Sequence, residues 1–214
     1  MNVGNYAKVH HNIVVIEGSG NLEITNDVIV NNNGKYEGIL NEIGDTKSNI
    51  KTNVYLNEEG SDAYYRVACA TSGEDEKNIT INIENNAMYT NAKMDNYGIA
   101  KDASKLTFTG IGTISHGSKE SANHQTSKIV IFDEKCKAET NPYLYIDEND
   151  IQASHAAAVG KIDEEQMFYM CSRGLSESEA KKFITLGYLT PVLDYISEYD
   201  IKERISNRLG KKVK

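Results

Sequence analysis

The stretch that decides the fold begins with Cys136-Lys-Ala-Glu139-Thr-Asn-Pro142, continues as Ser154-His155-Ala-Ala-Ala-Val-Gly160-Lys-Ile-Asp163-Glu-Glu-Gln166-Met-Phe168-Tyr169, and ends with Ser172-Arg173-Gly174. Before this stretch the chain has the composition of short strands, and after Gly160 apolar residues recur at helical spacing. Two of its side chains, Cys136 and His155, are able to bind a soft metal ion. The stretch therefore marks a boundary in the fold and a candidate site.

Short strands are predicted throughout the first 150 residues. Segments rich in β-branched and aromatic residues occur at 12–17, 27–30, 63–67, 78–83, 105–109, 128–132 and 143–146. Gly and Asn residues between them suit tight turns, and the Ser/Asn/Gln-rich segment around His124 is predicted to be a loop. Pro142 is the first proline, so little interrupts strand pairing before it. This pattern fits a β-sandwich and a β-solenoid equally well, because no clean repeat is present.

Four short helices are predicted after residue 160. The first two open with capping-box pairs, the third with proline at a first helical position, and the fourth with an aspartate cap. Helices this short need their apolar faces covered by the β core or by a partner protein. The predicted starts are Asp163, Ser176, Thr190-Pro191 and Asp200.

Composition limits the classes of function. The 214 residues suit one main domain, and a net charge of −8 argues against binding to nucleic acid or to an anionic membrane surface. We expect a cytoplasmic protein, since no long apolar run or secretory signal is present. Three widely spaced cysteines indicate reduced thiols. The chain has no phosphate-binding GxxxxGK[ST] loop, so we expect no direct nucleotide binding.

The quoted stretch resembles the end of the core domain of the SufB/SufD family, the scaffold subunits of SUF-type iron–sulfur cluster assembly. The segment from Ser154-His155 to Phe168-Tyr169, followed by the Ser172-Arg173-Gly174 turn, is similar to the SufD signature. Residues 133–142, which include Cys136, are similar to the SufB segment that carries the proposed cluster-assembly cysteine. Weaker similarity extends upstream through residues 91–99 and 104–110.

The resemblance implies a right-handed parallel β-helix, or β-solenoid, over residues 1–160 and a helical subdomain over residues 161–214. In the family two such cores pair, a nascent cluster is proposed to form near their interface, and the helices bind a SufC-type ABC ATPase. One chain with both hallmarks implies a homodimer. The implied function is a scaffold, not an enzyme. It would build or transfer a transient iron–sulfur cluster with sulfur from donor proteins, while the partner hydrolyses ATP.

The resemblance also implies candidate ligands. Cys136 is the first, because its thiolate binds iron and can hold persulfide sulfur, and His155 is the second. Glu139 is a third candidate, as an oxygen ligand. Without the resemblance, we would expect Cys136 to be a small buried hydrophobic residue, His155 a core histidine and Glu139 a solvated carboxylate. Lys135 and Lys137 would lower the pKa of Cys136 if their ammonium groups approached it.

We expect Cys136 and His155 of both protomers to meet at the dimer interface, where two thiolates and two imidazoles would supply four ligands. For the ATPase we expect apolar anchors on the C-terminal helices. These are Met167, Phe168, Leu175, Phe183, Leu186 and Tyr188, with Leu193 and Ile205 beside them.

The chain departs from the SufB pattern at two places. Residues 51–55 lack the cysteine proposed to accept sulfur, and Ala156 stands where SufB has glutamate. Sulfur delivery is therefore expected to differ. Two other functions share the implied fold: a polysaccharide lyase, which the absence of an evident carboxylate cluster opposes, and an inert interaction module. Only iron or sulfur binding separates the scaffold from the inert module.

Overall fold

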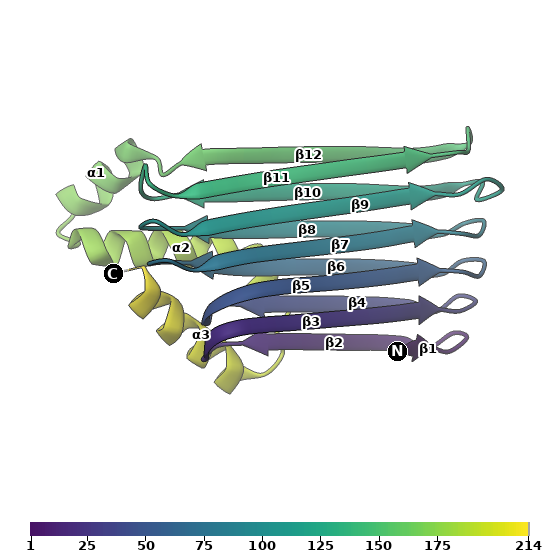
Figure 1. Cartoon of the computed structure of the whole chain (residues 1–214), viewed down its shortest axis with the longest axis horizontal. Coiled ribbons are helices and arrows are strands. Elements are labelled where there is room, and N and C mark those ends of the chain that lie inside the picture. Colours follow the sequence, from purple (N-terminus) through teal and green to yellow (C-terminus); the bar gives the residue numbers. More distant parts are fainter. Residues whose placement is uncertain (214) are drawn as a thin grey trace.

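The computed structural model describes residues 1–213 and contains two six-stranded sheets with three helices at the C-terminal end (Figure 1). The strands are β1 (Asn2–Val3), β2 (Lys8–Val15), β3 (Ser19–Val30), β4 (Lys35–Glu42), β5 (Asp45–Leu56), β6 (Asp62–Thr71), β7 (Glu76–Asn85), β8 (Asn91–Ala100), β9 (Lys105–Ile114), β10 (Ser121–Ile131), β11 (Lys137–Ile146) and β12 (Ile151–Lys161). The helices are α1 (Glu164–Ser172), α2 (Glu177–Leu193) and α3 (Tyr199–Lys212).

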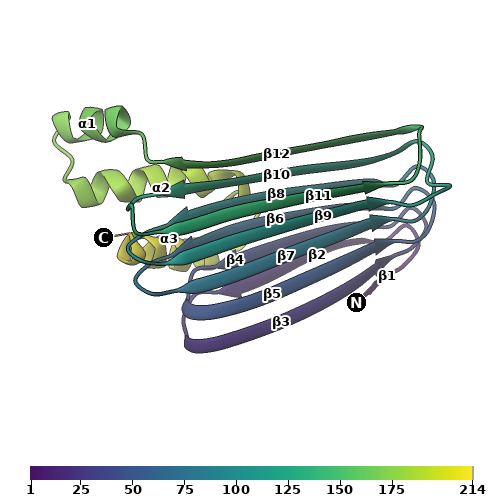
Figure 2. The same cartoon turned by 45° about the horizontal axis from the view of Figure 1, so that its top comes forward.

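The two sheets are wound from one continuous coil. Odd-numbered strands form one sheet in the order β1-β3-β5-β7-β9-β11, and even-numbered strands form the other in the order β2-β4-β6-β8-β10-β12. Every pairing is parallel, so each strand crosses to the opposite sheet before the chain returns to its own. Figure 2 shows the resulting two layers. The predicted β-solenoid is confirmed.

Stacked apolar side chains explain why the coil forms. In the odd-numbered sheet Ile50 is in register with Ile79, and Ile79 with Phe108, and all three are buried between the sheets. Along β7, which carries Ile79, fully buried residues alternate with more exposed ones. Each fully buried side chain of this size contributes about 1.5 to 3 kcal/mol. Repetition of the same inward positions from coil to coil makes the core continuous.

The C-terminal helices differ from the prediction, because residues 1–213 contain three and not four. The predicted third start at Pro191 lies inside α2, which also continues through Gly187, the expected end of the second helix. Leu189 and Val192 on this helix are fully buried against the outer face of the even-numbered sheet. We attribute the continuation to this packing, which offsets the weak helical preference of glycine and proline. The last helix begins at Tyr199 with Glu198 as its cap, not at Asp200.

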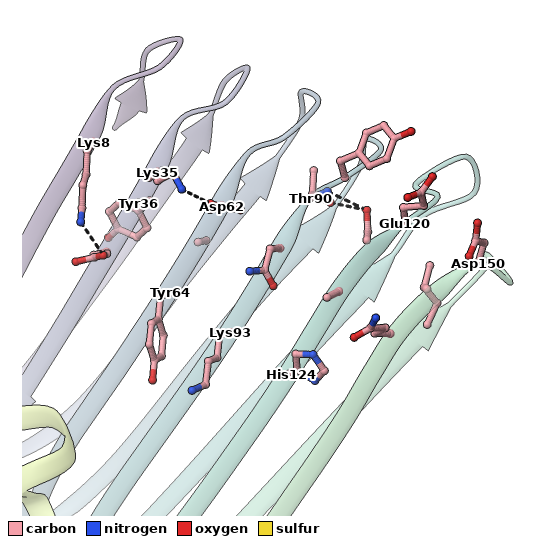
Figure 3. Close-up of a pocket in the computed structure, with 18 residues that line it drawn as sticks. Lys8, Lys35, Tyr36, Asp62, Tyr64, Thr90, Lys93, Glu120, His124 and Asp150 are labelled. Atoms are coloured by element: carbon pink, nitrogen blue, oxygen red, sulfur yellow. Dashed lines mark hydrogen bonds and ion pairs between the residues drawn. The ribbon is translucent and has the colours of Figure 1, made fainter.

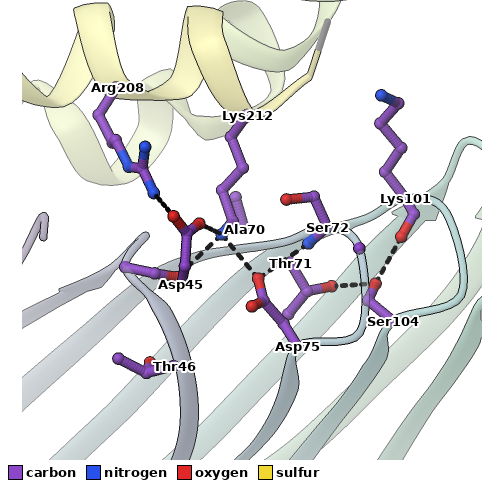
Figure 4. A network of polar contacts seen from close by, with 12 residues as sticks. Asp45, Thr46, Ala70, Thr71, Ser72, Asp75, Lys101, Ser104, Arg208 and Lys212 are labelled. Atoms are coloured by element: carbon purple, nitrogen blue, oxygen red, sulfur yellow. Dashed lines mark hydrogen bonds and ion pairs between the residues drawn. The ribbon is translucent and has the colours of Figure 1, made fainter. Parts of the chain in front are cut away.

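The end of α3 is fixed to the solenoid by a cluster of charges. Lys212 Nζ lies 2.8 Å from Asp45 Oδ1, 2.6 Å from Asp75 Oδ2 and 2.8 Å from the carbonyl oxygen of Gly44. Arg208 also forms an ion pair with Asp45. Figure 4 shows both basic side chains reaching from the helix to the turns of the solenoid. Hydrogen bonding from Lys212 is the main cause that lowers the pKa of Asp45.

Replacing Lys212 with methionine is expected to lower the free energy of unfolding by about 2 kcal/mol, because Asp75 then stays buried without its cation while Asp45 is half exposed. The matched control is Lys211→Met, since Lys211 is exposed on the same helix. Denaturant unfolding would give the free energies, and amide hydrogen exchange would report the release of α3. Equal stability of both variants would contradict a role for this cluster.

Candidate functional site

The solenoid ends in an open edge. Among residues 1–213, β11 pairs only with β9, and β12 pairs only with β10, so both sheets finish with unpaired backbone groups. Both strands lie at the top of Figure 1. All residues from Ser154 to Gly160 are exposed, and five of them are Ala156-Ala-Ala-Val-Gly160. The edge strand therefore presents small side chains that permit close approach of another backbone.

Cys136 lies in the turn between β10 and β11, at the end of the sheets where the helices are. Its side chain is half-buried and packs against the main hydrophobic core. The thiol donates to the carbonyl oxygen of Asp102 at 3.5 Å, and the backbone N–H of Cys136 donates to the carbonyl oxygen of Asp133 at 3.2 Å. The turn thus fixes this sulfur beside the open edge.

Burial raises the pKa of the Cys136 thiol, and the carboxylates of Asp133 and Asp102 raise it further. Lys135 and Lys137 are both exposed, and neither is among the groups that shift this pKa, so the condition under which they would lower it is not met. Burial and the carboxylates both favour the protonated thiol over the thiolate. Binding to a metal ion would release that proton.

His155 lies on β12 and is in register with Gln125 of β10. Because Gln125 faces the interior, His155 faces the space between the sheets, yet it is exposed because no described coil covers this end. Glu139 lies on β11, in register with Thr107, and is exposed. The structure places the three candidate ligands at the open end of the solenoid, but on different elements.

Cys136 and His155 of one chain are far apart along the strands. Ile131 precedes the Cys136 turn and is in register with Lys161, and Lys161 Nζ lies 2.8 Å from Glu134 Oε1 in that turn. His155 is six positions before Lys161 on β12. At ~3.3 Å per residue, the histidine is about 20 Å from the level of the turn. Among residues 1–213, no group of three or more His, Cys, Asp or Glu side chains is placed to hold a metal ion.

A polar layer lies beneath the open edge, and sequence reasoning missed it. Strand β10 begins at Ser121, so the segment around His124 is a strand and not the predicted loop, and the strand predicted at 128–132 is the end of β10. Its inward side chains include Asn123, Gln125 and Ser127, all almost fully buried. Polar residues at every second position could have indicated a strand with a polar inner face. The same segment is rich in Ser, Asn and Gln, however, and that composition is typical of a loop.

The predicted ATPase anchors fall into two groups. Phe168 is 77% exposed and Phe183 is 54% exposed, while Met167 and Leu175 are partly buried. Leu186 and Tyr188 pack against the cluster that joins the helices to the solenoid. The helix α1 has no buried residue. Figure 2 shows α1 projecting from the solenoid beyond the end of β12. The most exposed anchors are therefore the two phenylalanines.

A polar groove of about 970 Å³ crosses the outer face of the even-numbered sheet at the starts of its strands (Figure 3). Among its lining residues, Lys35 pairs with Asp62 at 3.0 Å, and Lys8 pairs with Glu37 at 3.1 Å. The groove is at the opposite end of the strands from the Cys136 turn. It is therefore separate from the candidate site.

Two further cysteines lie away from the open edge. Cys69 is fully buried, which raises its pKa to about 12. Cys171 is exposed on α1. Within residues 1–213, no helix has the length and hydrophobicity needed to cross a membrane.

Comparison with known proteins gives a consistent result. Residues 1–188 match the family model described as "SUF system FeS cluster assembly, SufBD core domain". The chain is 33% identical over 177 residues to the iron–sulfur cluster assembly protein SufD of Bacillus subtilis, covering 83% of this chain and 40% of that protein. It is 24% identical over 131 residues to SufD of Escherichia coli, covering 61% of this chain and 31% of that protein.

A match to SufB accompanies the matches to SufD. The iron–sulfur cluster assembly protein SufB of Bacillus subtilis is 33% identical over 102 residues, which cover 48% of this chain and 22% of that protein. The chain spans less than half the length of these relatives. With its parallel solenoid and a family match that covers most of its length, the chain belongs to the SufB/SufD family.

Proposed function

We propose that the chain is a homodimeric scaffold that assembles or transfers a nascent iron–sulfur cluster. The observation that carries the proposal is the open edge formed by β11 and β12, which brings an exposed histidine and a half-buried cysteine to one end of the solenoid. Names of the relatives support a role in cluster assembly. Thiolate and imidazole are suitable iron ligands, as in mixed cysteine–histidine centres.

Pairing of two copies through β12 would supply hydrogen-bond partners for the unpaired backbone groups of the open edge. A two-fold axis perpendicular to the sheet makes the two copies of β12 antiparallel, so both sheets continue across the interface. If the axis passes through Ala158, His155 lies opposite the partner's Lys161, because both are three positions from the axis. Lys161 is at the level of the Cys136 turn. His155 of each chain would then approach Cys136 of the other.

This pairing produces two equivalent sites, each with one thiol and one imidazole. Their separation is about 20 Å, the distance between Cys136 and His155 along one chain. The pairing therefore replaces the single four-ligand set that the sequence suggested. With two ligands from the protein, the remaining coordination positions of the iron would be filled by sulfide and other small molecules. Weak retention of this kind suits a scaffold that must release its cargo.

The proposal includes partners. A SufC-type ABC ATPase would bind through the exposed side chains of α1 and α2, and sulfur donor proteins would deliver sulfide or persulfide to Cys136. Closure of two bound ATPases would change the scaffold interface if its two states bind the ATPase pair with different affinity. We further propose that this takes place in the cytoplasm and that the chain itself hydrolyses no nucleotide.

Anaerobic reconstitution with ferrous iron and sulfide tests the proposed function. We expect the wild-type chain to develop charge-transfer absorption in the visible range, and we expect Cys136→Ser and His155→Ala to lose most of it. Glu139→Gln tests the third candidate ligand, and Cys171→Ser is the matched control for loss of an exposed thiol. A wild-type spectrum in both the Cys136 and His155 variants would favour an inert interaction module.

A further inference from the structure

The side chain of Gln125 is held in place beneath the open edge. Gln125 is 3% exposed, and its Nε2 donates to the carbonyl oxygen of Tyr143 on β11 at 2.9 Å. Its carboxamide oxygen, Oε1, is buried and has no hydrogen-bond partner among the described residues. A buried acceptor without a donor is costly, so this oxygen indicates a missing partner.

Two glycines on the facing strand make room for this carboxamide. A Cβ atom at Gly110 would lie 2.8 Å from Gln125 Oε1, and a Cβ atom at Gly112 would lie 2.6 Å from Gln125 Nε2. Any larger residue at these positions would collide with the amide. The amide therefore occupies a space that the neighbouring backbone leaves open for it.

The available donor on the next coil is His155. It is the direct Cα partner of Gln125 on β12, and both side chains point to the same face of the sheet. The two side chains are not hydrogen-bonded to each other in the structure. Because adjacent strands are ~4.8 Å apart, rotation of the His155 side chain would bring an imidazole N–H to the Gln125 carboxamide.

We propose that Gln125 is a positioning residue for His155, its carboxamide oxygen accepting a hydrogen bond from one ring N–H. The other ring nitrogen is then unprotonated and faces the open edge. Histidines that bind metals usually donate their second N–H in this way, which fixes the tautomer and the orientation of the ring. The inference rests on the proposed function only for the identity of the metal, because the proposed hydrogen bond does not require iron.

The test is nitrogen NMR of the full-length chain, labelled with ¹⁵N-histidine, reduced and free of metal, at a pH near 9 where imidazoles of ordinary pKa are neutral. His155→Asn identifies the His155 signals. We expect one predominant tautomer in the wild type and a mixture of both in Gln125→Met, which has a similar volume and no carboxamide. Gln125→Glu keeps an acceptor and should keep the single tautomer. Ser127→Ala is the control, since Ser127 is a buried neighbour on the same inward face.

Ferrous iron alone serves as the second probe. We expect Gln125→Met to weaken its binding about tenfold, with Gln125→Glu restoring most of the affinity. A tautomer mixture in the wild type, or an unchanged tautomer in folded Gln125→Met, would overturn the inference. A tautomer mixture in the wild type would do so even if Gln125→Met does not fold. Failure of the wild type to bind iron, with the single tautomer present, would instead count against the proposed function.

Discussion

Replacement of Ala158 by cysteine is expected to give nearly complete disulfide-linked dimers under mild oxidation. A two-fold axis through this residue makes it its own partner in the antiparallel pair, at a Cα separation of about 4.5 to 5.5 Å. That separation lies within the range of disulfides. Cross-linking is measured by non-reducing electrophoresis in a background of Cys136→Ser and Cys171→Ser, and Cys69 is fully buried.

The matched control is Gln152→Cys, which places an exposed cysteine on the same face of the same strand. With the axis at Ala158, two copies of residue 152 are roughly 40 Å apart, so they should not cross-link. If β12 paired instead with β11 of the partner, Ala158→Cys would stay monomeric on the gel. A monomer in sedimentation of the unmodified chain would exclude both arrangements.

Substitution of Phe183 by glutamate is expected to weaken binding of the cognate ABC ATPase by about 2 kcal/mol or more, roughly a thirtyfold rise in Kd. Phe183 is exposed on α2, and Phe168 is exposed on α1. A charge placed among a few apolar anchors must be desolvated when the complex forms. The effect of Phe168→Glu should be similar in size.

Binding of the purified ATPase to the full chain can be measured by calorimetry. Tyr199→Glu is the control, because Tyr199 is 75% exposed but lies at the start of α3. Removal of all three helices is a poorer test, since α2 and α3 cover apolar residues of the even-numbered sheet. Equal affinity of Phe183→Glu, Phe168→Glu and wild type would place the ATPase elsewhere.

Much of the fold was predictable, and the failures have physical causes. Seven of the twelve strands in residues 1–213 overlap a predicted segment, whereas β1, β4, β5, β8 and β12 do not. The alanines of β12 have low strand propensity, and its pairing with β10 supplies what the local sequence lacks. A new helix was also expected to start at Pro191, because local sequence does not show the tertiary packing of Val192 that keeps α2 continuous. The choice between sandwich and solenoid depended on the family resemblance, since alternation within a strand does not reveal parallel pairing.

The site was predictable as a set of residues but not as an arrangement. Cys136 and His155 were identified from family resemblance, and only the strand register shows that one chain separates them by about 20 Å. Lys77, which is fully buried in an ion pair with Glu42, gave no signal because lysine is ordinarily exposed. Gln125 was hidden for a similar reason, since an isolated glutamine between polar residues reads as surface.

The most direct measurement of the central claim is iron and sulfide loading of a mixed dimer. One chain carries Cys136→Ser, the other carries His155→Ala, and two different affinity tags allow isolation of the heterodimer alone. If each site combines Cys136 of one chain with His155 of the other, the heterodimer has one intact site and one with neither ligand. It should then load about half as much cluster as the wild type, while each single-variant homodimer loads almost none. A heterodimer as empty as the two homodimers would contradict a site shared between chains.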